Sequence, residues 1–291
     1  MPISTSRKPD GLWKMSVGER EESLKKLEQE IVEKFGSPRE LFDRLRLDAK
    51  FVAAVAEFMV TKGRDPKHFF AKTSHIRKLM DNGANFFGIE DYENLFGLTF
   101  TAQELAAVPE FTWSKKTLNS PCPFNEGLEI KDTHFAFLGL ENFNGQWLSM
   151  IRWNRILDDA DSIQLNIKQN IASEHRIGAS GCRFRWYLMT LAVIPGSTDR
   201  NRSEQVQDIP EGYTIPYAIE EITKRILYFR KNGRFSDRTE TRCRESIRRG
   251  FDISVGSYGN GTNGAIRVEE VSCDFHSQNL GLVLSRKPEN N

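Results

Sequence analysis

Three sets of residues in this chain have side chains that could do chemistry: an acidic cluster, a histidine near an aspartate, and four cysteines. Asp158, Asp159 and Asp161 lie together in the chain, and carboxylate oxygens are the ligands that Ca²⁺ and Mg²⁺ prefer. Adjacent aspartates do not point in one direction on any regular element, and sites for such ions usually gather ligands from several segments. The sequence therefore disfavours a metal ion here, and we expect no cofactor.

His134 stands close to Asp132 at the start of an apolar run, and such a pair could act as a general base. A structural histidine with hydrogen-bonded ring nitrogens is the favoured interpretation. The cysteines are spread along the chain without a CxxC pair or a histidine at zinc-finger spacing. They are Cys122, Cys182, Cys243 and Cys273. We expect them to be free thiols.

Motifs typical of nucleotide-binding and hydrolytic enzymes are missing from the sequence. The glycine-rich segment GNGTNG, residues 259–264, precedes AIRVEEV rather than a helix, so it does not have the context of a phosphate-binding loop. The chain has no GxSxG elbow and no HExxH motif. The sequence therefore predicts a protein that is not an enzyme.

Composition and charge limit the class of protein. The chain has 291 residues, of which 38% are hydrophobic, enough to bury a sizeable core. Lysine and arginine number 41 against 40 aspartates and glutamates, and this balance disfavours nucleic acid and acidic membranes as partners. The sequence contains no apolar run long enough for a membrane span and no apolar segment of signal-peptide type. We expect a cytoplasmic protein.

The first part of the chain has the periodicity of helices. Apolar residues recur at steps of three and four, and glycines or prolines separate the periodic segments. Helices are predicted over residues 16–36, 37–63 and 65–83, and a capping box predicts a short helix from Thr101. Such helices could form a DNA-binding domain, but the favoured interpretation of their scattered cations is a solvated helix face.

The pattern changes from about Phe111. A buried strand is predicted over 133–140, one long strand over 182–197, and a helix over 215–233 that packs on a sheet. A polar, arginine-rich stretch over 234–250 then precedes closing strands that begin at Phe251. We therefore predict an α+β protein, with a helical N-terminal region over 1–108 and a mixed domain over 109–291.

The stretch VGSYGNGTNGAIRVEEVSCDFHSQNLGLVLSRK, Val255 to Lys287, combines strand-like ends with a middle of small, polar and aromatic residues. Tyrosine, serine, asparagine and glycine on a rigid frame are the residue types that adaptable binding surfaces use. An ordinary solvent loop and hairpin turn is the alternative. Composition alone favours the ordinary loop.

Four segments carry a resemblance to known proteins. They are CPFNEGLEIKDTHFAFLGL, CRFRWYLM, the IPGST turn followed by IPYAIEEITKRILYFRKNG, and NLGLVLSRK. Over roughly residues 110–287 the chain resembles a poorly characterised group of bacterial and archaeal proteins that end in LGLxxSRK. The C-terminal part of that group is in turn similar to the variable proteins of diversity-generating retroelements.

The resemblance implies a C-type-lectin-like fold whose terminal strands and loops present a ligand surface. The retroelement rewrites such a surface by mutating adenines, so the expected function is the binding of varied protein or other macromolecular partners. GFDISVG and NLGLVLSRK would be fixed framework. The candidate variable, ligand-binding residues are Ser254, Ser257, Tyr258, Asn260, Arg267, Ser272, Asp274, His276, Ser277 and Gln278.

Two features depart from the better-known variable proteins. Leu280 to Leu282 stand where those proteins have GFR, and the preceding SWxx pattern is absent. Glu269 and Glu270 cannot arise from asparagine codons by adenine changes alone.

Two alternatives to a diversified binding protein stay open. A nucleic-acid-associated structural protein would use the N-terminal helices and the arginines from Arg238 to Arg249. The lectin-like fold also includes an oxidase that modifies sulfatases, and that activity would require Cys243 and Cys273 to meet in a reactive pair.

Overall fold

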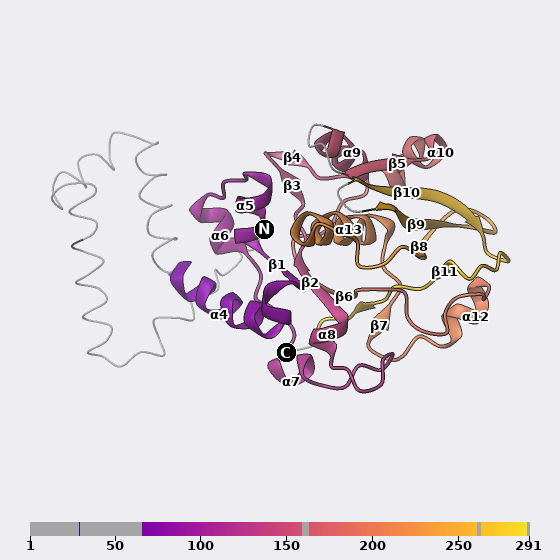
Figure 1. The fold of residues 1–291 in the computed structure, drawn as a ribbon. Coiled ribbons are helices and arrows are strands. Elements are labelled where there is room, and N and C mark those ends of the chain that lie inside the picture. Colours follow the sequence, from indigo (N-terminus) through magenta and orange to yellow (C-terminus); the bar gives the residue numbers. More distant parts are fainter. Residues whose placement is uncertain (1–28, 30–65, 159–162, 261–262, 290–291) are drawn as a thin grey trace, which may run out of the picture. The chain divides into compact units, whose positions relative to one another are not determined.

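The computed structural model describes residues 29, 66–158, 163–260 and 263–289 (Figure 1). Apart from residue 29, the helices predicted over 16–36 and 37–63 lie outside these residues, as do Asp159 and Asp161 of the acidic cluster. The described part contains both helices and sheets, which confirms the predicted α+β class.

The chain divides into two units, one formed by residues 1–72 and 100–108 and the other by residues 73–99 and 109–291. In the smaller unit the structure describes the start of α4 (Pro66–Leu79) and all of α6 (Ala102–Ala107). Both confirm predicted helices. The predicted capping box is present, since the Thr101 N–H donates to Glu104 Oε2 at 2.8 Å and Thr101 Oγ1 accepts from the Glu104 N–H at 3.2 Å.

The larger unit contains two five-stranded sheets. The first sheet has the order β1-β2-β6-β12-β7, formed by Phe86–Phe87, His134–Leu138, Trp186–Thr190, Ser285–Arg286 and Tyr213–Thr214. The second sheet has the order β11-β8-β9-β10-β5, formed by Leu280–Gly281, Glu240–Arg248, Phe251–Asn260, Asn263–Ser272 and Ile163–Ile167. A small hairpin joins β3 (Asn142–Phe143) to β4 (Gln146–Trp147).

Helices of the larger unit, apart from the end of α4, lie between and beside these strands. They are α5 (Ile89–Phe96), α7 (Lys115–Leu118), α8 (Ile130–Thr133), α9 (Met150–Asp158), α10 (Gln169–Ser173), α11 (His175–Gly178), α12 (Arg202–Gln207) and α13 (Ala218–Asn232). Most are only one or two turns long, so strands and α13 form most of the framework.

The strand predictions are confirmed in part. The strand predicted over 133–140 is β2, whose five residues are all buried, and the closing strands begin at Phe251 as predicted. The long strand predicted over 182–197 is wrong in extent, because β6 ends at Thr190 and the Val193 N–H then donates to Asp237 Oδ2 at 2.9 Å. The arginine-rich stretch 234–250 contains strand β8, which the polar composition did not indicate.

Helix α13 confirms the predicted helix but is buried on all sides. It packs against β1 and β2 of the first sheet and against β8 and β9 of the second (Figure 1). The Tyr217 N–H donates to Glu220 Oε2 at 3.0 Å at its start, and Gly233 ends it with φ of 68°. The helix therefore packs on a sheet, as predicted, and a second sheet covers its other side.

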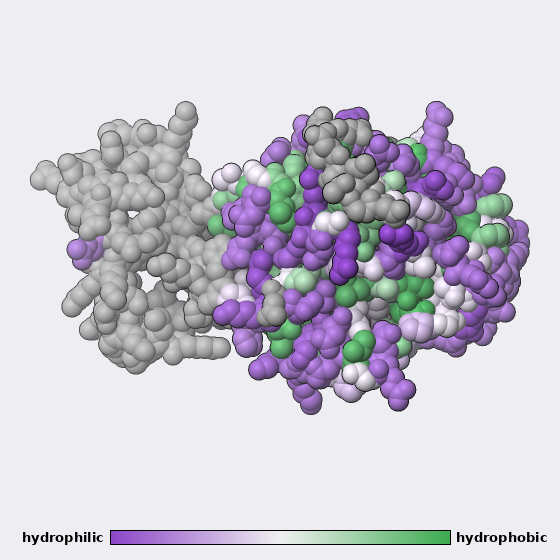
Figure 2. Space-filling model, viewed as in Figure 1, coloured by the Kyte–Doolittle hydropathy of each residue, from purple (hydrophilic) through white to green (hydrophobic). Residues whose placement is uncertain are grey.

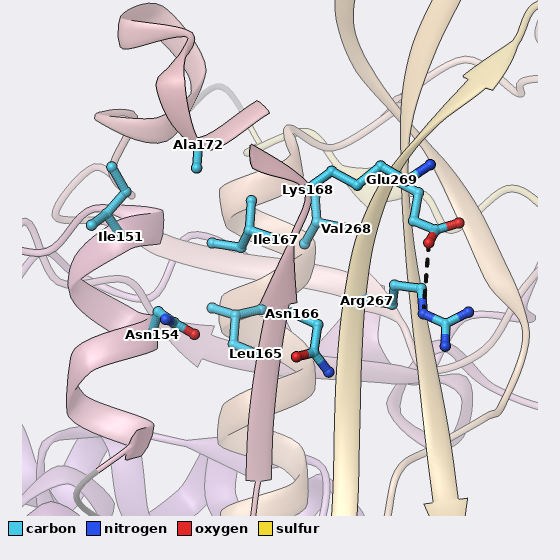
Figure 3. A pocket seen from close by; sticks show the side chains of 10 residues that line it. All are labelled: Ile151, Asn154, Leu165, Asn166, Ile167, Lys168, Ala172, Arg267, Val268 and Glu269. Atoms are coloured by element: carbon cyan, nitrogen blue, oxygen red, sulfur yellow. Dashed lines mark ion pairs between the residues drawn. The ribbon is translucent and has the colours of Figure 1, made fainter. Parts of the chain in front are cut away.

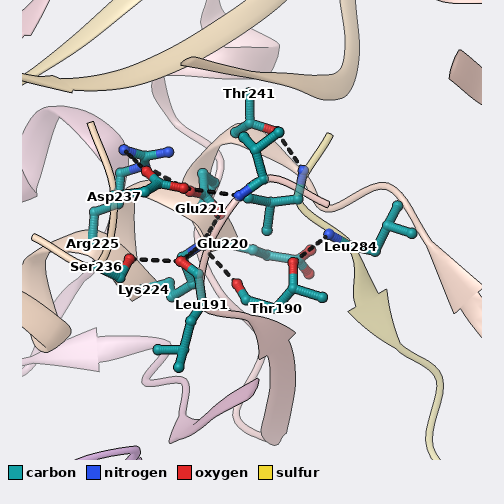
Figure 4. A network of polar contacts seen from close by, with 12 residues as sticks. Thr190, Leu191, Glu220, Glu221, Lys224, Arg225, Ser236, Asp237, Thr241 and Leu284 are labelled. Carbon is teal, nitrogen blue, oxygen red and sulfur yellow. Dashed lines mark hydrogen bonds and ion pairs between the residues drawn. The ribbon is translucent and has the colours of Figure 1, made fainter. Parts of the chain in front are cut away.

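Four charged residues lie in this interior, which we name the buried charge cluster: Glu221, Lys224, Arg225 and Asp237 (Figure 4). The side chains of Glu221, Lys224 and Arg225 are at most 1% exposed. Arg225 Nε donates to Glu221 Oε1 at 2.6 Å, and Lys224 Nζ lies 3.0 Å from Glu221 Oε2. Because two cations face two carboxylates, the cluster carries no net charge and its members offset one another's burial.

The buried charge cluster also binds the backbone of both sheets. Lys224 Nζ donates to the carbonyl of Thr190 in β6 at 3.1 Å. Arg225 donates to Ser257 Oγ on β9 and, at 3.1 Å, to the carbonyl of Thr239 just before β8. The cluster therefore links α13 to the two sheets by directional bonds as well as by apolar packing.

The C-terminal segment 280–286 runs from the second sheet to the first. Leu280 and Gly281 pair with β8, and Ser285 then pairs with Met189 of β6. Between these strands Leu282 and Leu284 are fully buried in a cluster with Ile194, Tyr213 and Ile215. The segment expected to be fixed framework is thus part of the core.

We predict that Leu282→Ala lowers the free energy of unfolding by about 2 to 5 kcal/mol, because it empties space that a fully buried side chain fills. Val206→Ala is the matched control. Val206 is 43% exposed, so its truncation should change stability by less than about 0.5 kcal/mol. Urea unfolding of the two variants measures the difference, and equal losses would contradict the interior position of Leu282.

Arg225→Met should cost about 3 to 5 kcal/mol, because it leaves the Glu221 and Asp237 carboxylates with Lys224 as their remaining cation in the interior. Arg248→Met removes an arginine that is 62% exposed and paired with Glu270 at 3.3 Å, and should cost at most about 1 kcal/mol. Urea unfolding compares the two. A loss of less than about 1 kcal/mol from Arg225→Met would show that the cluster contributes little.

Candidate functional site

The second sheet has an inner face toward α13 and an outer face away from it. Ser257 marks the inner face, because its Oγ accepts a hydrogen bond from Arg225 of α13 and donates to the carbonyl of Asp237 at 3.1 Å. Side chains alternate along a strand, so Ser254 and Tyr258 of β9 belong to the outer face.

The structure separates the candidate variable residues by position. Ser254 and Ser257 are buried, with 2% and 0% exposure. Tyr258 and Arg267 lie on the open part of the outer face. The side chain of Asn260, at the end of β9, lies outside the described part. Of the remaining five, Ser272 is the last residue of β10, and the other four follow it in the chain: Asp274, His276, Ser277 and Gln278.

Tyr258 and Arg267 form a stacked pair on the outer face. The Tyr258 hydroxyl donates to Glu240 Oε1 of β8, and the Arg267 guanidinium lies 4.5 Å from the centre of the Tyr258 ring. Gly256 of β9 lies between Glu240 of β8 and Arg267 of β10. A Cβ at this position would meet Glu240 Cγ at 2.6 Å. Burial and the Glu240 carboxylate raise the pKa of Tyr258 to about 12, so the ring stays a neutral hydrogen-bond donor at physiological pH.

Residues 273–279, which we name the crossing loop, connect β10 to β11. These strands are on opposite sides of β8 and β9 in the sheet, so the loop must pass them. It passes on the outer face, where Arg242 of β8 donates to the carbonyls of Ser272 and Phe275 at 2.9 and 2.5 Å. Arg242 is fully buried, and Asp252 Oδ2 lies 3.6 Å from its guanidinium.

Backbone contacts fix the crossing loop along its length. The Arg202 N–H donates to the Cys273 carbonyl at 2.9 Å, and the Asp199 N–H to the Ser277 carbonyl at 2.8 Å. At the far end the Glu240 N–H donates to the Asn279 carbonyl at 2.7 Å. The side chains of Asp274, Phe275, His276, Gln278 and Asn279 are nevertheless exposed.

A pocket of about 420 Å³ lies beside the crossing loop, lined by Asn201, Arg202, Ser203, Val206, Cys273 and Asp274. Exposed hydrophobic side chains occur on α12, where Val206 is 43% exposed, and on the crossing loop, where Phe275 is 52% exposed. The face of the larger unit seen in Figure 2 is mostly hydrophilic, with hydrophobic residues in small groups. Phe275 is a candidate contact residue because its ring is exposed and the backbone of its loop is fixed.

The candidate general base His134 has a structural environment. Its ring is fully buried, Nδ1 lies 3.2 Å from the Ile130 carbonyl, and the Tyr213 hydroxyl lies 3.1 Å from Nε2. The Asp132 carboxylate accepts the Glu129 N–H at 3.1 Å. The favoured interpretation, a hydrogen-bonded structural histidine, agrees with this geometry.

All four cysteines are free thiols, as predicted, and three of them are buried. Arg242 projects from the outer face of β8, so its neighbour Cys243 projects from the inner face, where burial raises the pKa of its thiol. Cys273 adjoins Asp252 on the outer face. The two thiols that an oxidase would bring together are thus on opposite faces of the sheet.

The arginines of the nucleic-acid alternative have different environments. Arg242 is buried, while Arg244 stacks on Tyr217 at 5.1 Å and Arg248 on Phe251 at 4.1 Å. In the part of the chain that the structure describes, no group of three or more histidine, cysteine or carboxylate side chains could hold a metal ion. In that same part, no helix has the length and apolarity needed to cross a membrane.

Sequence reasoning did not identify Phe275, and it included Arg242 only among the arginines of the nucleic-acid alternative. The signal for Phe275 was present, since it is one apolar ring within the polar run SCDFHSQN. Arg242 had no local signal, because its partners Asp252, Ser272 and Phe275 are distant in the chain.

We predict that His134 makes stability depend on pH. Burial, with Arg286 nearby, lowers the pKa of His134 to about 3 from 6.5. Between pH 3 and 6.5 the unfolded state therefore binds more protons than the folded state, which lowers the free energy of unfolding as the pH falls. The contribution of His134 to the free energy of unfolding is complete above pH 6.5 and falls by roughly 3 to 5 kcal/mol as the pH approaches 3. His134→Gln cannot take up this proton.

Urea unfolding of the native protein and His134→Gln at about pH 7 and about pH 4 measures the effect. The variant should lose less stability than the native protein on acidification. An equal loss in both proteins would contradict the assignment.

Comparison of the chain with protein families, with curated proteins and with solved structures gave no match. The site therefore has to be judged by its own side chains. It offers an exposed phenylalanine, a carboxylate, an imidazole and amides on a fixed backbone.

Proposed function

We propose that the protein binds macromolecular partners through the crossing loop and the adjoining open part of the outer face. One observation carries the proposal: the backbone of the loop is fixed by buried Arg242 and by the contacts of Cys273, Ser277 and Asn279, while its side chains are exposed. A loop that is already ordered loses little conformational freedom on binding, so more of its contact energy becomes affinity.

We further propose that this surface is diversified by a retroelement on a C-type-lectin-like fold, as the sequence resemblance implies. The exposed candidates Arg267, Asp274, His276 and Gln278 support this extension, because changes there leave the core intact. Tyr258 is half-buried on the same face. Ser254 and Ser257 are interior positions, so diversification there would disturb the contacts of Arg225 and Glu240.

The DNA around the gene tests the diversification. A near-copy of the 3′ coding region that differs at template adenines, next to a reverse transcriptase gene, is the expected finding. Its variable codons should include those of the exposed candidates. Absence of any such copy would overturn diversification.

We predict that a library randomised at Asp274, Phe275, His276 and Gln278 keeps its thermal unfolding midpoint within about 3 °C for most members, because these side chains are exposed. Selection of this library on an immobilised protein such as lysozyme should yield binders.

A library randomised at Ser254 and Ser257 is the matched control, since most of its members should unfold at lower temperature or fail to fold. Similar destabilisation of the two libraries, or no binders from the first, would contradict the proposed surface.

A further inference from the structure

Strand β5 forms one edge of the second sheet and is paired only to β10 among the described strands. A pocket of about 450 Å³ lies against β5 and the neighbouring β10, next to α9 and α10 (Figure 3). Its lining consists of Ile151, Asn154, Leu165, Asn166, Ile167, Lys168, Ala172, Arg267, Val268 and Glu269. Open space beside an unpaired strand edge is where an additional strand can bind.

The hydrogen-bond pattern shows which backbone groups face the open edge. In a parallel pair, alternate residues of a strand bond to its neighbour. The Lys168 N–H donates to the Val268 carbonyl at 3.2 Å, so Asn166, two residues earlier, also directs its backbone groups to β10. The N–H and C=O groups of Leu165 and Ile167 therefore point toward the open edge.

The two sides of the edge have different chemistry. In Figure 3 the side chains of Leu165 and Ile167 extend toward α9, where Ile151 lies, whereas those of Asn166 and Lys168 extend to the opposite side. Leu165 is buried, and Asn166 and Lys168 are exposed. A strand laid along this edge would meet apolar groups with every second side chain and polar groups with the others.

The polar side is positively charged. The Lys168 ammonium forms no ion pair with any described residue. Arg267, one strand further in, is held over Tyr258, and its closest carboxylate oxygen, Glu269 Oε1, lies 3.7 Å away, beyond hydrogen-bond distance. At the edge itself the exposed cations Lys168 and Arg267 accompany one carboxylate, Glu269, whereas Glu240 lies further in and is bound to Tyr258. Exposed cations at the edge favour a partner with acidic side chains.

We infer that β5 accepts an extended segment of a partner protein as an added strand, with apolar side chains toward α9 and acidic side chains toward Lys168 and Arg267. The inference rests on the proposed function, since it names the kind of partner that this end of the binding surface takes. Main-chain hydrogen bonds to Leu165 and Ile167 supply affinity, and the alternation of side chains supplies specificity.

Two synthetic peptides test the inference on the full chain. One is acetyl-Asp-Val-Asp-Val-Asp-Val-amide, and the other has lysine in place of each aspartate. The acidic peptide should bind saturably and shift the amide NMR signals of Leu165 and Ile167, and the basic peptide should not. Lys168→Glu should weaken the acidic peptide about tenfold, whereas the exposed matched control Lys287→Glu should leave its affinity unchanged.

Equal binding of both peptides, no shift at Leu165 and Ile167, or equal effects of the two lysine variants would overturn the inference. Self-association that shifts these amides without peptide would also overturn it, in favour of a second copy of this chain. The crossing-loop library gives an independent result. If the library yields binders but the peptide does not bind at β5, strand addition alone is refuted. If the peptide binds at β5 but the library yields no binders, only the proposed loop surface is refuted.

Discussion

The arrangement of the larger unit depends on the mutual neutralisation of four charges in its interior. Helix α13 is buried between two sheets, and an isolated ion there would be costly to remove from water. Glu221 and Asp237 face Lys224 and Arg225, and the cations also bind backbone carbonyls beside each sheet. Such bonds have fixed directions, so they set the rotation of the helix in a way that apolar packing alone would not. Loss of any one of the four charged side chains would therefore leave an unbalanced charge in the interior.

The orientation of α13 also determines which side chains of the second sheet lie on its outer face. Once Ser257 faces Arg225, the strand alternation places Tyr258 on the outer face, and the register with β10 places Arg267 beside it. The same alternation directs Arg242 outward under the crossing loop. A buried arginine therefore organises each face, Arg225 toward the helix and Arg242 toward the loop. The proposed binding surface and the core are two sides of one sheet.

The sequence predicted elements whose signals are local. The helix at 218–232 has a periodic apolar pattern and a glycine at its end, and β2 is a short apolar run. Strand β8 was missed because its arginines look like a solvated run, although Arg242 is buried by partners far away in the chain. For the candidate site, composition found the crossing loop but could not separate exposed from interior serines. Ser257 is buried because its face meets α13, whereas Ser254 is buried on the outer face beside Arg242, and both are tertiary properties.

The path of the C-terminal segment has a consequence for how the chain acquires its structure. Strand β12 lies between β6 and β7, although it follows every other described strand in the chain. The first sheet therefore cannot close during synthesis until the ribosome has passed the crossing loop and released the residues after it. A frameshift or stop codon within the loop would leave a gap in the middle of that sheet. Only chains translated in the correct reading frame through the segment proposed to vary would thus complete the first sheet.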